Sequence, residues 1–165
     1  MPSPADTLSA LCQGCGLCCD GTLFARVPVS AAERDRLLVA AGVQVERRPD
    51  GAFALPQRCA ALSGCRCTVY ADRPGRCREY QCLLFAAVEA SEVDLDEARA
   101  VIHGAGHLIA ELGRCAFGAQ DDGMAVVARF RALATDAQGP ALPAEARRAF
   151  LALQAYLDRH FRGRR

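Results

Sequence analysis

The cysteines are the residues of this chain whose types and spacing could do chemistry. There are ten, and eight of them form two sets in the first half. The first set reads C-x-x-C-G-x-C-C and comprises Cys12, Cys15, Cys18 and Cys19. The second set is more widely spaced and comprises Cys59, Cys67, Cys77 and Cys82. Thiolates at such spacing are ligands that zinc and iron–sulfur clusters take, so the sequence predicts at least one metal site here.

The adjacent pair Cys18 and Cys19 predicts that the two sets fold together around metal. Side chains of neighbouring residues usually diverge, so one ion would hold both only with poor geometry. Either the two residues serve two centres, or one of them joins the second set. In the alternative arrangement, the four cysteines of the first set close a local site by themselves.

The two remaining cysteines are expected to be bystanders. Cys65 lies two residues before Cys67 and is redundant with it. Cys115 stands alone in the second half of the chain and is expected to be a small buried residue.

A helical pair of histidines is a further candidate. His103 and His107 are four residues apart, with Glu111 one turn further on, so the three would share one helix face. That spacing could hold a metal, but the sequence is not H-E-x-x-H and contains two glycines. We therefore expect half-buried histidines with ordinary hydrogen bonds.

Arginines accompany the second cysteine set. They can offset thiolate charge and donate hydrogen bonds to sulfur, or they can simply solvate a loop, and the sequence leaves both interpretations open. These residues are Arg58, Arg66, Arg73, Arg76 and Arg78.

The composition argues against several classes of protein. The formal net charge is +1, which disfavours a general nucleic-acid or anionic-membrane binder. No apolar run approaches the roughly 20 residues that cross a bilayer, and the first residues do not resemble a secretory leader. We therefore expect a cytoplasmic protein that contacts neither nucleic acid nor membrane. Thiols stay reduced in that compartment, so ten cysteines point to metal rather than to disulfides.

The first half should contain little regular structure. Ser30 and Glu33 form a capping box that predicts a helix over 31–41. Alternating apolar residues around Asp50 and Gly51 predict a hairpin of 43–47 with 52–55. The cysteine-bearing stretches 8–24 and 57–82 are expected to be loop-like, although 75–88 could form a helix with Cys77 and Cys82 near its ends.

The second half should be helical. A capping box at Asp94 and Glu97 opens a helix that Gly113 is expected to end. Further helices are expected at about 123–135 and 143–161. The predicted fold is an α-rich α+β single domain over 1–165, in which an irregular, metal-stapled cysteine-rich half (8–85) with a small hairpin packs on the C-terminal helices (92–162).

The cysteine pattern resembles the bacterial YkgJ-like CxxCxxCC family of cysteine-cluster proteins, described as zinc- or iron-chelating. The resemblance covers about residues 8–85: the C-x-x-C-G-x-C-C run, Val27-Pro-Val-Ser30 before a helix with Glu33, and the segment from Cys67 to Cys82 around Arg73-Pro74. The chain has Gln81 where the family usually has proline. The ligands that the resemblance implies are Cys12, Cys15, Cys18, Cys19, Cys59, Cys67, Cys77 and Cys82.

The resemblance implies metal binding and no particular reaction, so the catalytic residues and enzyme status stay open. The leading hypothesis is a metal-binding protein that holds zinc or an iron–sulfur cluster, with zinc slightly favoured. One alternative is a redox or methyltransferase-like enzyme component, because flagellin lysine N-methylases carry a related cysteine module. The absence of nucleotide motifs counts against it. The other alternative is an adaptor whose metal staples a docking surface for a protein partner.

Overall fold

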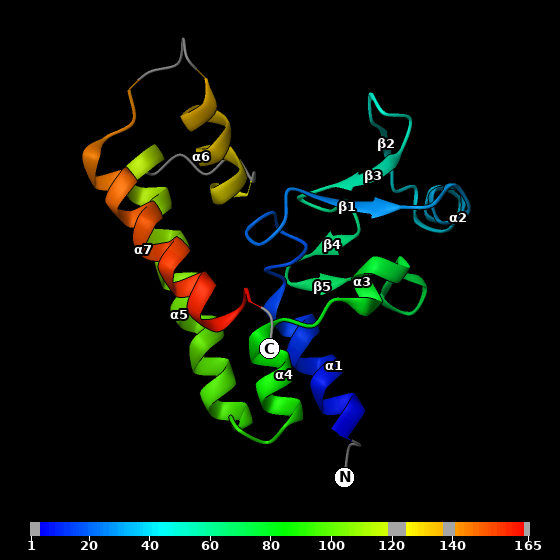
Figure 1. Cartoon of the computed structure of the whole chain (residues 1–165), viewed down its shortest axis with the longest axis horizontal. Coiled ribbons are helices and arrows are strands. Elements are labelled where there is room, and N and C mark those ends of the chain that lie inside the picture. Colours follow the sequence, from blue (N-terminus) through cyan, green and yellow to red (C-terminus); the bar gives the residue numbers. More distant parts are fainter. Residues whose placement is uncertain (1–3, 119–124, 137–140, 164–165) are drawn as a thin grey trace. The chain divides into compact units, whose positions relative to one another are not determined.

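A computed structural model describes residues 4–118, 125–136 and 141–163. It divides the chain into two compact units. The cysteine unit is Cys12–Gln81, and the helical unit comprises Met1–Leu11 and Cys82–Arg165. Across the described residues the structure contains seven α-helices and two small antiparallel sheets, which confirms the α-rich α+β prediction (Figure 1).

A three-stranded antiparallel sheet supports the cysteine unit. Its strand order is β1 (Arg26–Val29), β3 (Phe53–Pro56), β2 (Glu46–Arg47). The hairpin of β2 with β3 was predicted, and it turns through a bond from the Gly51 N–H to the Arg48 carbonyl at 2.9 Å. The pairing of β1 with β3 was not predicted. A second hairpin, β4 (Leu62–Ser63) with β5 (Arg66–Cys67), replaces part of the expected loop.

Helix α2 (Ala31–Ala41) matches its predicted bounds. The Ser30 hydroxyl accepts a hydrogen bond from the Glu33 N–H at 3.3 Å, and the Glu33 carboxylate accepts one from the Ser30 N–H at 2.7 Å. Both halves of the capping box are therefore formed.

Two corrections concern the cysteine-bearing segments. Residues up to 15 are not a loop, because α1 (Pro4–Cys15) carries Cys12 and Cys15 on its last turn. The expected helix over 75–88 is broken into α3 (Gly75–Glu79) and α4 (Leu83–Glu89) by extended backbone at Tyr80 and Cys82. A short 3₁₀ helix, η1 (Tyr70–Asp72), precedes α3.

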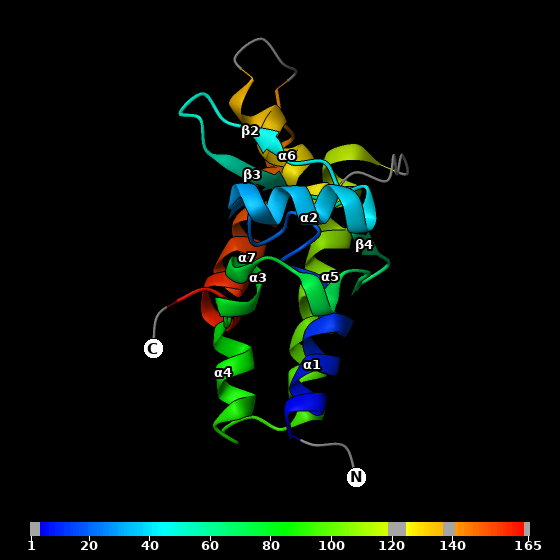
Figure 2. The same ribbon diagram turned by 90° about the vertical axis from the view of Figure 1, so that its right-hand side faces the viewer.

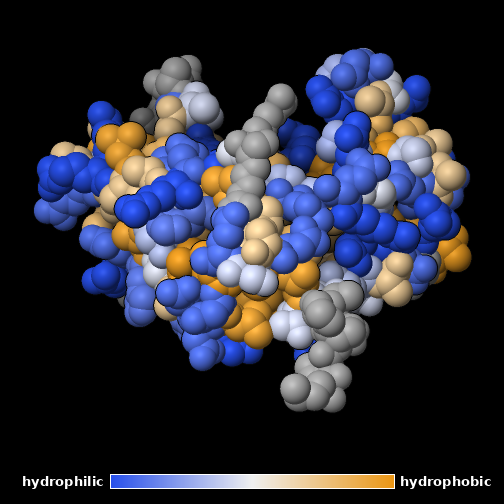
Figure 3. All heavy atoms as spheres, turned by 60° about the horizontal axis from the view of Figure 1, so that its bottom comes forward, coloured by the Kyte–Doolittle hydropathy of each residue, from blue (hydrophilic) through white to orange (hydrophobic). Residues whose placement is uncertain are grey.

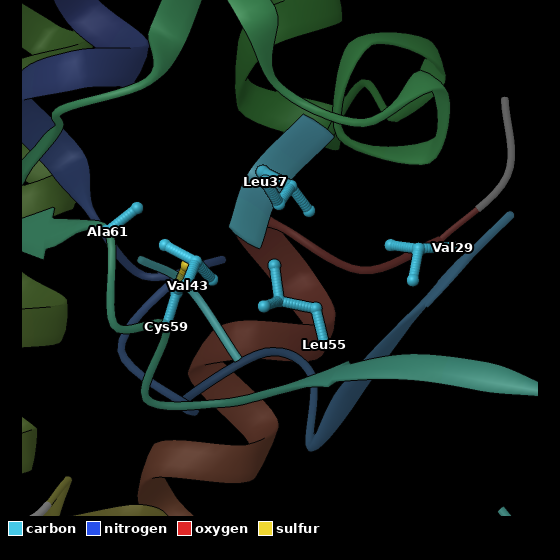
Figure 4. Packing of buried hydrophobic residues seen from close by; sticks show 6 residues of the cluster. All are labelled: Val29, Leu37, Val43, Leu55, Cys59 and Ala61. Atoms are coloured by element: carbon cyan, nitrogen blue, oxygen red, sulfur yellow. The ribbon is translucent and has the colours of Figure 1, made fainter. Parts of the chain in front are cut away.

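The core of the cysteine unit is a small aliphatic cluster that includes one thiol. Leu37 of α2 and Leu55 of β3 face Val43, and the sulfur of Cys59 lies among these side chains (Figure 4). Cys19 and Val69 pack against the cluster from its edge. One cysteine of each set therefore belongs to the apolar packing of this unit.

Three longer helices form most of the helical unit. Helix α5 (Leu95–Phe117) packs along α7 (Ala144–His160) and also contacts α6 (Val126–Thr135) (Figures 1 and 2). The predicted capping box at Asp94 and Glu97 is present. Gly113 lies inside α5, which continues to Phe117, so the predicted end at Gly113 is wrong.

Helix α7 packs through one apolar face. Leu153, Leu157 and Phe161 are buried, and the Phe150 ring stacks on Phe130 of α6 with ring centroids 4.6 Å apart. None of the described helices is long and apolar enough to cross a membrane. On the face drawn in Figure 3, hydrophobic residues are interspersed with hydrophilic ones.

Candidate metal centre

The two cysteine sets meet through the backbone. The Cys59 N–H donates a hydrogen bond of 2.8 Å to the carbonyl of Cys19. Cys19 leaves a tight turn in which the Gly16 carbonyl accepts from the N–H groups of Cys19 and Asp20 at 2.8 and 3.0 Å. Cys59 is fixed in the apolar cluster, so the end of the first set is held against the start of the second.

Cys19 lies in the electrostatic field of cysteines from both sets. Burial raises the pKa of its thiol to about 12, and the negative charges of four other cysteines add to the effect. In decreasing order of their effect, these are Cys59, Cys67, Cys77 and Cys12. A thiolate at Cys19 would therefore be opposed by its neighbours unless a cation balanced them.

As for Cys19, burial and the charges of nearby cysteines raise the pKa values of Cys77 and Cys59. Burial raises the pKa of Cys77 to about 11, with Cys59 and Cys67 adding to the rise and the Arg73 guanidinium opposing it. Burial also raises the pKa of Cys59, the backbone N–H of Ala61 lowers it, and Cys67 raises it. The charges of Cys59 and Cys67 raise the pKa of both Cys19 and Cys77, and we call Cys19, Cys59, Cys67 and Cys77 the joined group.

The sulfurs of the joined group do not form a preformed coordination sphere. Among residues 4–118, 125–136 and 141–163, no three His, Cys, Asp or Glu side chains converge closely enough to hold a metal ion. Neutral thiols do not attract one another strongly, whereas a bound cation would attract the thiolates to itself. The donor chemistry fits a soft metal, and binding requires the sulfurs to draw together.

Comparison with protein families bears on the same residues. A family described as "CxxCxxCC: Putative zinc- or iron-chelating domain" matches residues 11–101, more than half of the chain. The chain belongs to the CxxCxxCC family. The match confirms the resemblance and indicates metal binding, without distinguishing zinc from iron. The searches of curated proteins and of solved structures found no match to this chain.

The CxxCxxCC match extends beyond the cysteine unit and includes Cys82. This residue is the N-cap of α4, and its sulfur accepts a hydrogen bond from the Phe85 N–H at 3.4 Å. Burial raises the pKa of its thiol, and backbone N–H groups of α4 oppose the rise. Cys82 belongs to the helical unit, so its proposed membership in a centre with the joined group stays a prediction.

Cys15 and Cys18 complete the CxxCxxCC signature. Both are half-buried, and Cys12 is exposed. Cys12 and Cys15 are three residues apart on α1, a spacing that places two side chains on one helix face. The helical C-x-x-C spacing therefore puts Cys12 and Cys15 on one face of α1.

The bystander cysteines and the histidines differ in part from expectation. Cys65 is exposed in the turn between β4 and β5, and Cys115 on α5 is half-buried rather than buried. His103 and His107 are exposed, not half-buried, as is Glu111. The described histidines therefore lie outside the group of thiols that interact with Cys19.

The arginines of the second set bind mainly oxygen. Arg73 lies over the Tyr70 ring, 3.7 Å from its centroid, and donates to the Tyr70 carbonyl at 2.6 Å. Arg78 donates to the Arg73 and Ala71 carbonyls at 2.9 and 3.0 Å. Because Arg73 also opposes the rise in the pKa of Cys77, charge compensation is supported at that position.

Two carboxylates near the joined group were not predicted as site residues. Asp20 accepts a bond of 2.7 Å from the Thr22 N–H, and burial raises its pKa even though the Thr22 bonds and the Arg58 charge lower it. The pKa of Glu33 is lowered, first by the Gly75 N–H and then by the Ser30 N–H. The capping box revealed the second bond, but no sequence signal pointed to Gly75.

Proposed function

We propose that this protein is a metal chelator whose cysteine unit is organised around one thiolate centre, with Cys19, Cys59, Cys67 and Cys77 as ligands. The observation that carries the proposal is the hydrogen bond of 2.8 Å from the Cys59 N–H to the Cys19 carbonyl. It supports a shared centre over a local site closed by the first set. Cys12 lies at the edge of this group, and Cys15, Cys18 and Cys82 are proposed ligands of the same or a second centre.

Zinc is the ion that we propose for this centre. Four thiolates suit its tetrahedral geometry and leave no open position, which is the pattern of a structural site. The cysteine unit has ten arginines and seven carboxylates, a formal charge of +3. That excess would help to balance a Zn(Cys)₄ centre, whose own charge is −2.

An iron–sulfur cluster is the second candidate. The C-x-x-C-x-x-C run of Cys12, Cys15 and Cys18 favours it, because three closely spaced cysteines and one remote cysteine are typical of cubane clusters. The two candidates differ in colour. An iron–sulfur protein absorbs in the visible range and bleaches in air, whereas zinc is silent.

The test is metal analysis of the protein purified without oxygen, combined with its visible spectrum. We expect about one zinc per chain, or more if Cys12, Cys15, Cys18 and Cys82 build a second centre. Finding iron and sulfide would show that the centre is a cluster and not zinc. The substitutions below would then test whether the two sets share it. Absence of any stoichiometric metal would contradict the proposal.

Single substitutions test which thiols are ligands. Cys67→Ser and Cys77→Ser should each lower metal content, because a hydroxyl is a poor replacement for a thiolate on a soft metal. Cys115→Ser is the matched control and should leave metal content unchanged. If Cys67→Ser retains all metal while Cys15→Ser loses it, the first set closes a local site and the shared centre is wrong.

A further inference from the structure

One carboxylate joins the beginnings of two helices in the cysteine unit. Glu33 Oε2 accepts the Ser30 N–H at 2.7 Å, which caps α2. Glu33 Oε1 accepts the Gly75 N–H, also at 2.7 Å, across 42 residues of sequence. The same side chain therefore closes a local capping box and a long-range bond.

The long-range bond acts at the start of the helix that carries Cys77. Gly75 is the first residue of α3, and the N-cap residue Pro74 makes no side-chain hydrogen bond to the helix. Helix α3 has five residues, too few to be stable from its own backbone bonds. Its orientation must therefore come from contacts with other elements.

Contacts from two sides hold α3. Arg78 clasps the preceding 3₁₀ turn through the Ala71 and Arg73 carbonyls at 3.0 and 2.9 Å. Glu33 holds the helix start to α2, and α3 also packs against β1. The clasp of Arg78 joins α3 only to its sequence neighbours, whereas Glu33 joins it to the layer that contains Leu37 and the Cys59 cluster.

We propose that Glu33 is a positioning residue for Cys77, holding α3 so that this thiol reaches the metal centre of the joined group. The inference rests on the proposed function. It assigns to the capping glutamate a role outside its own helix, since one oxygen would suffice for the capping box.

The charge of Glu33 makes the inference testable, because positioning and charge predict opposite changes in metal affinity. A carboxylate near Cys77 disfavours the thiolate that a metal needs, so charge alone would make Glu33 harmful to metal binding. Glu33→Gln removes that charge and also removes one of the two acceptor oxygens. If positioning dominates, the variant binds metal more weakly, and if charge dominates, it binds metal more tightly.

The experiment compares Glu33→Gln with Glu97→Gln in the full chain loaded with zinc. Glu97 is the matched control, because it completes the capping box of α5 through the Asp94 N–H at 3.1 Å without a long-range bond to another helix start. Transfer of zinc to a chromophoric chelator is followed in each protein. We expect Glu33→Gln to hold zinc about tenfold more weakly, as for other outer-shell partners of metal ligands. Glu97→Gln should match the unmodified chain.

A second variant removes the donor instead of the acceptor. Gly75→Pro replaces the N–H hydrogen by Cδ, so Glu33 Oε1 must withdraw, while Glu33 Oε2 can still accept the Ser30 N–H that caps α2. Proline is well tolerated at a first helical position, and Pro74, with ψ of 153°, already has the backbone that a following proline requires. We expect the same loss of zinc affinity in this variant as in Glu33→Gln.

Amide exchange gives a readout that does not depend on zinc transfer. In the chain saturated with zinc, the Gly75 N–H should exchange faster in Glu33→Gln than in Glu97→Gln. Unchanged exchange at Gly75, or zinc held as tightly as in the control or more tightly, would overturn the inference. Failure of the unmodified chain to bind zinc or iron would instead count against the proposed function.

Discussion

The cysteine unit and the helical unit bury different kinds of side chain. Seven side chains are the largest of those fully buried in the described residues, and five belong to the helical unit. These five are Phe161, Leu112, Leu153, Leu157 and Val127. The cysteine unit contributes only Val43 and Thr22. Its buried apolar cluster includes a thiol, Cys59, and the ring of Phe53, which packs against the cluster, is only partly buried.

The two units therefore depend on different sources of stability. Long helices with leucine and phenylalanine along one face bury enough apolar surface to hold together by packing. The cysteine unit has strands of two to four residues and helices of 5 and 11 residues beyond α1. Bonds from a metal to several thiolates would replace the packing that this unit lacks.

Removal of metal should therefore unfold the cysteine unit and leave the helical unit folded. This is the largest effect that we expect. Structural zinc contributes on the order of 10 kcal/mol to small thiolate modules, comparable to the whole stability of many domains. A strong chelator should abolish amide protection over β1, β3 and α3 and leave it in α5 and α7. Hydrogen exchange with mass spectrometry on the full chain resolves the two regions.

Two outcomes would contradict a metal-dependent cysteine unit beside a helical unit held by packing. Protection retained in the cysteine unit, with metal shown to be absent, would mean that packing alone suffices there. Protection lost from α5 and α7 at the same chelator concentration would mean that the helical unit also depends on the metal.

Two glycines, Gly16 and Gly14, allow a test of how tightly the first cysteine set packs within the cysteine unit. Gly16 has φ of +72°, and a Cβ there would lie 3.2 Å from the Cα of Cys65. Gly16→Ala should destabilise this unit by about 2–4 kcal/mol, because backbone strain and a tight contact combine. Chemical denaturation of the zinc-loaded chain, followed by a probe in the cysteine unit, measures the change.

Gly14→Ala is the control for this substitution. Gly14 is helical in α1, and a Cβ there would meet nothing within 4 Å. Alanine should be neutral or slightly stabilising at this position, by up to about 1 kcal/mol. Equal losses in the two variants would show that the turn at Gly16 is not held against Cys65.

Local signals were the part of the fold that the sequence predicted well. The capping boxes at Ser30 and Asp94 involve residues three apart, so α2 and the start of α5 could be recognised without any knowledge of the tertiary structure. Helix α1 was not predicted, because Gly14 and the two cysteines of its last turn favour a ligand loop. Strand β1 was not predicted, because its partner β3 is separated from it along the chain by α2 and β2.

In the candidate site, too, some contacts could be predicted from the sequence and others could not. The adjacency of Cys18 and Cys19 predicts that thiols of the two sets share a metal centre. The bond from the Cys59 N–H to the Cys19 carbonyl brings the backbones of the two sets together, and the shared metal is a proposal. The bond from Glu33 to Gly75 could not be predicted, because a capping glutamate has the same sequence pattern with or without a second partner.

The smallest expected effects belong to α5, where two glycines lie in different surroundings. At Gly104, a Cβ would overlap the hydroxyl of Tyr156, which donates to the Val101 carbonyl at 3.1 Å. At Gly106, a Cβ would meet nothing within 4 Å. Gly104→Ala should destabilise the helical unit by about 1–2 kcal/mol, since displacing Tyr156 outweighs the gain in helix propensity. Gly106→Ala should stabilise it by up to about 1 kcal/mol.

Thermal unfolding followed by circular dichroism at 222 nm, with zinc content measured in parallel, tests this pair. Because packing rather than metal is expected to hold the helical unit, both variants should keep the zinc of the unmodified chain while their melting temperatures move in opposite directions. The double variant Gly104→Ala with Tyr156→Phe should recover part of the loss, because the displaced hydroxyl is gone. Loss of zinc from Gly104→Ala would show that strain in α5 reaches the thiolates, and the two units could then no longer be treated as separately stabilised.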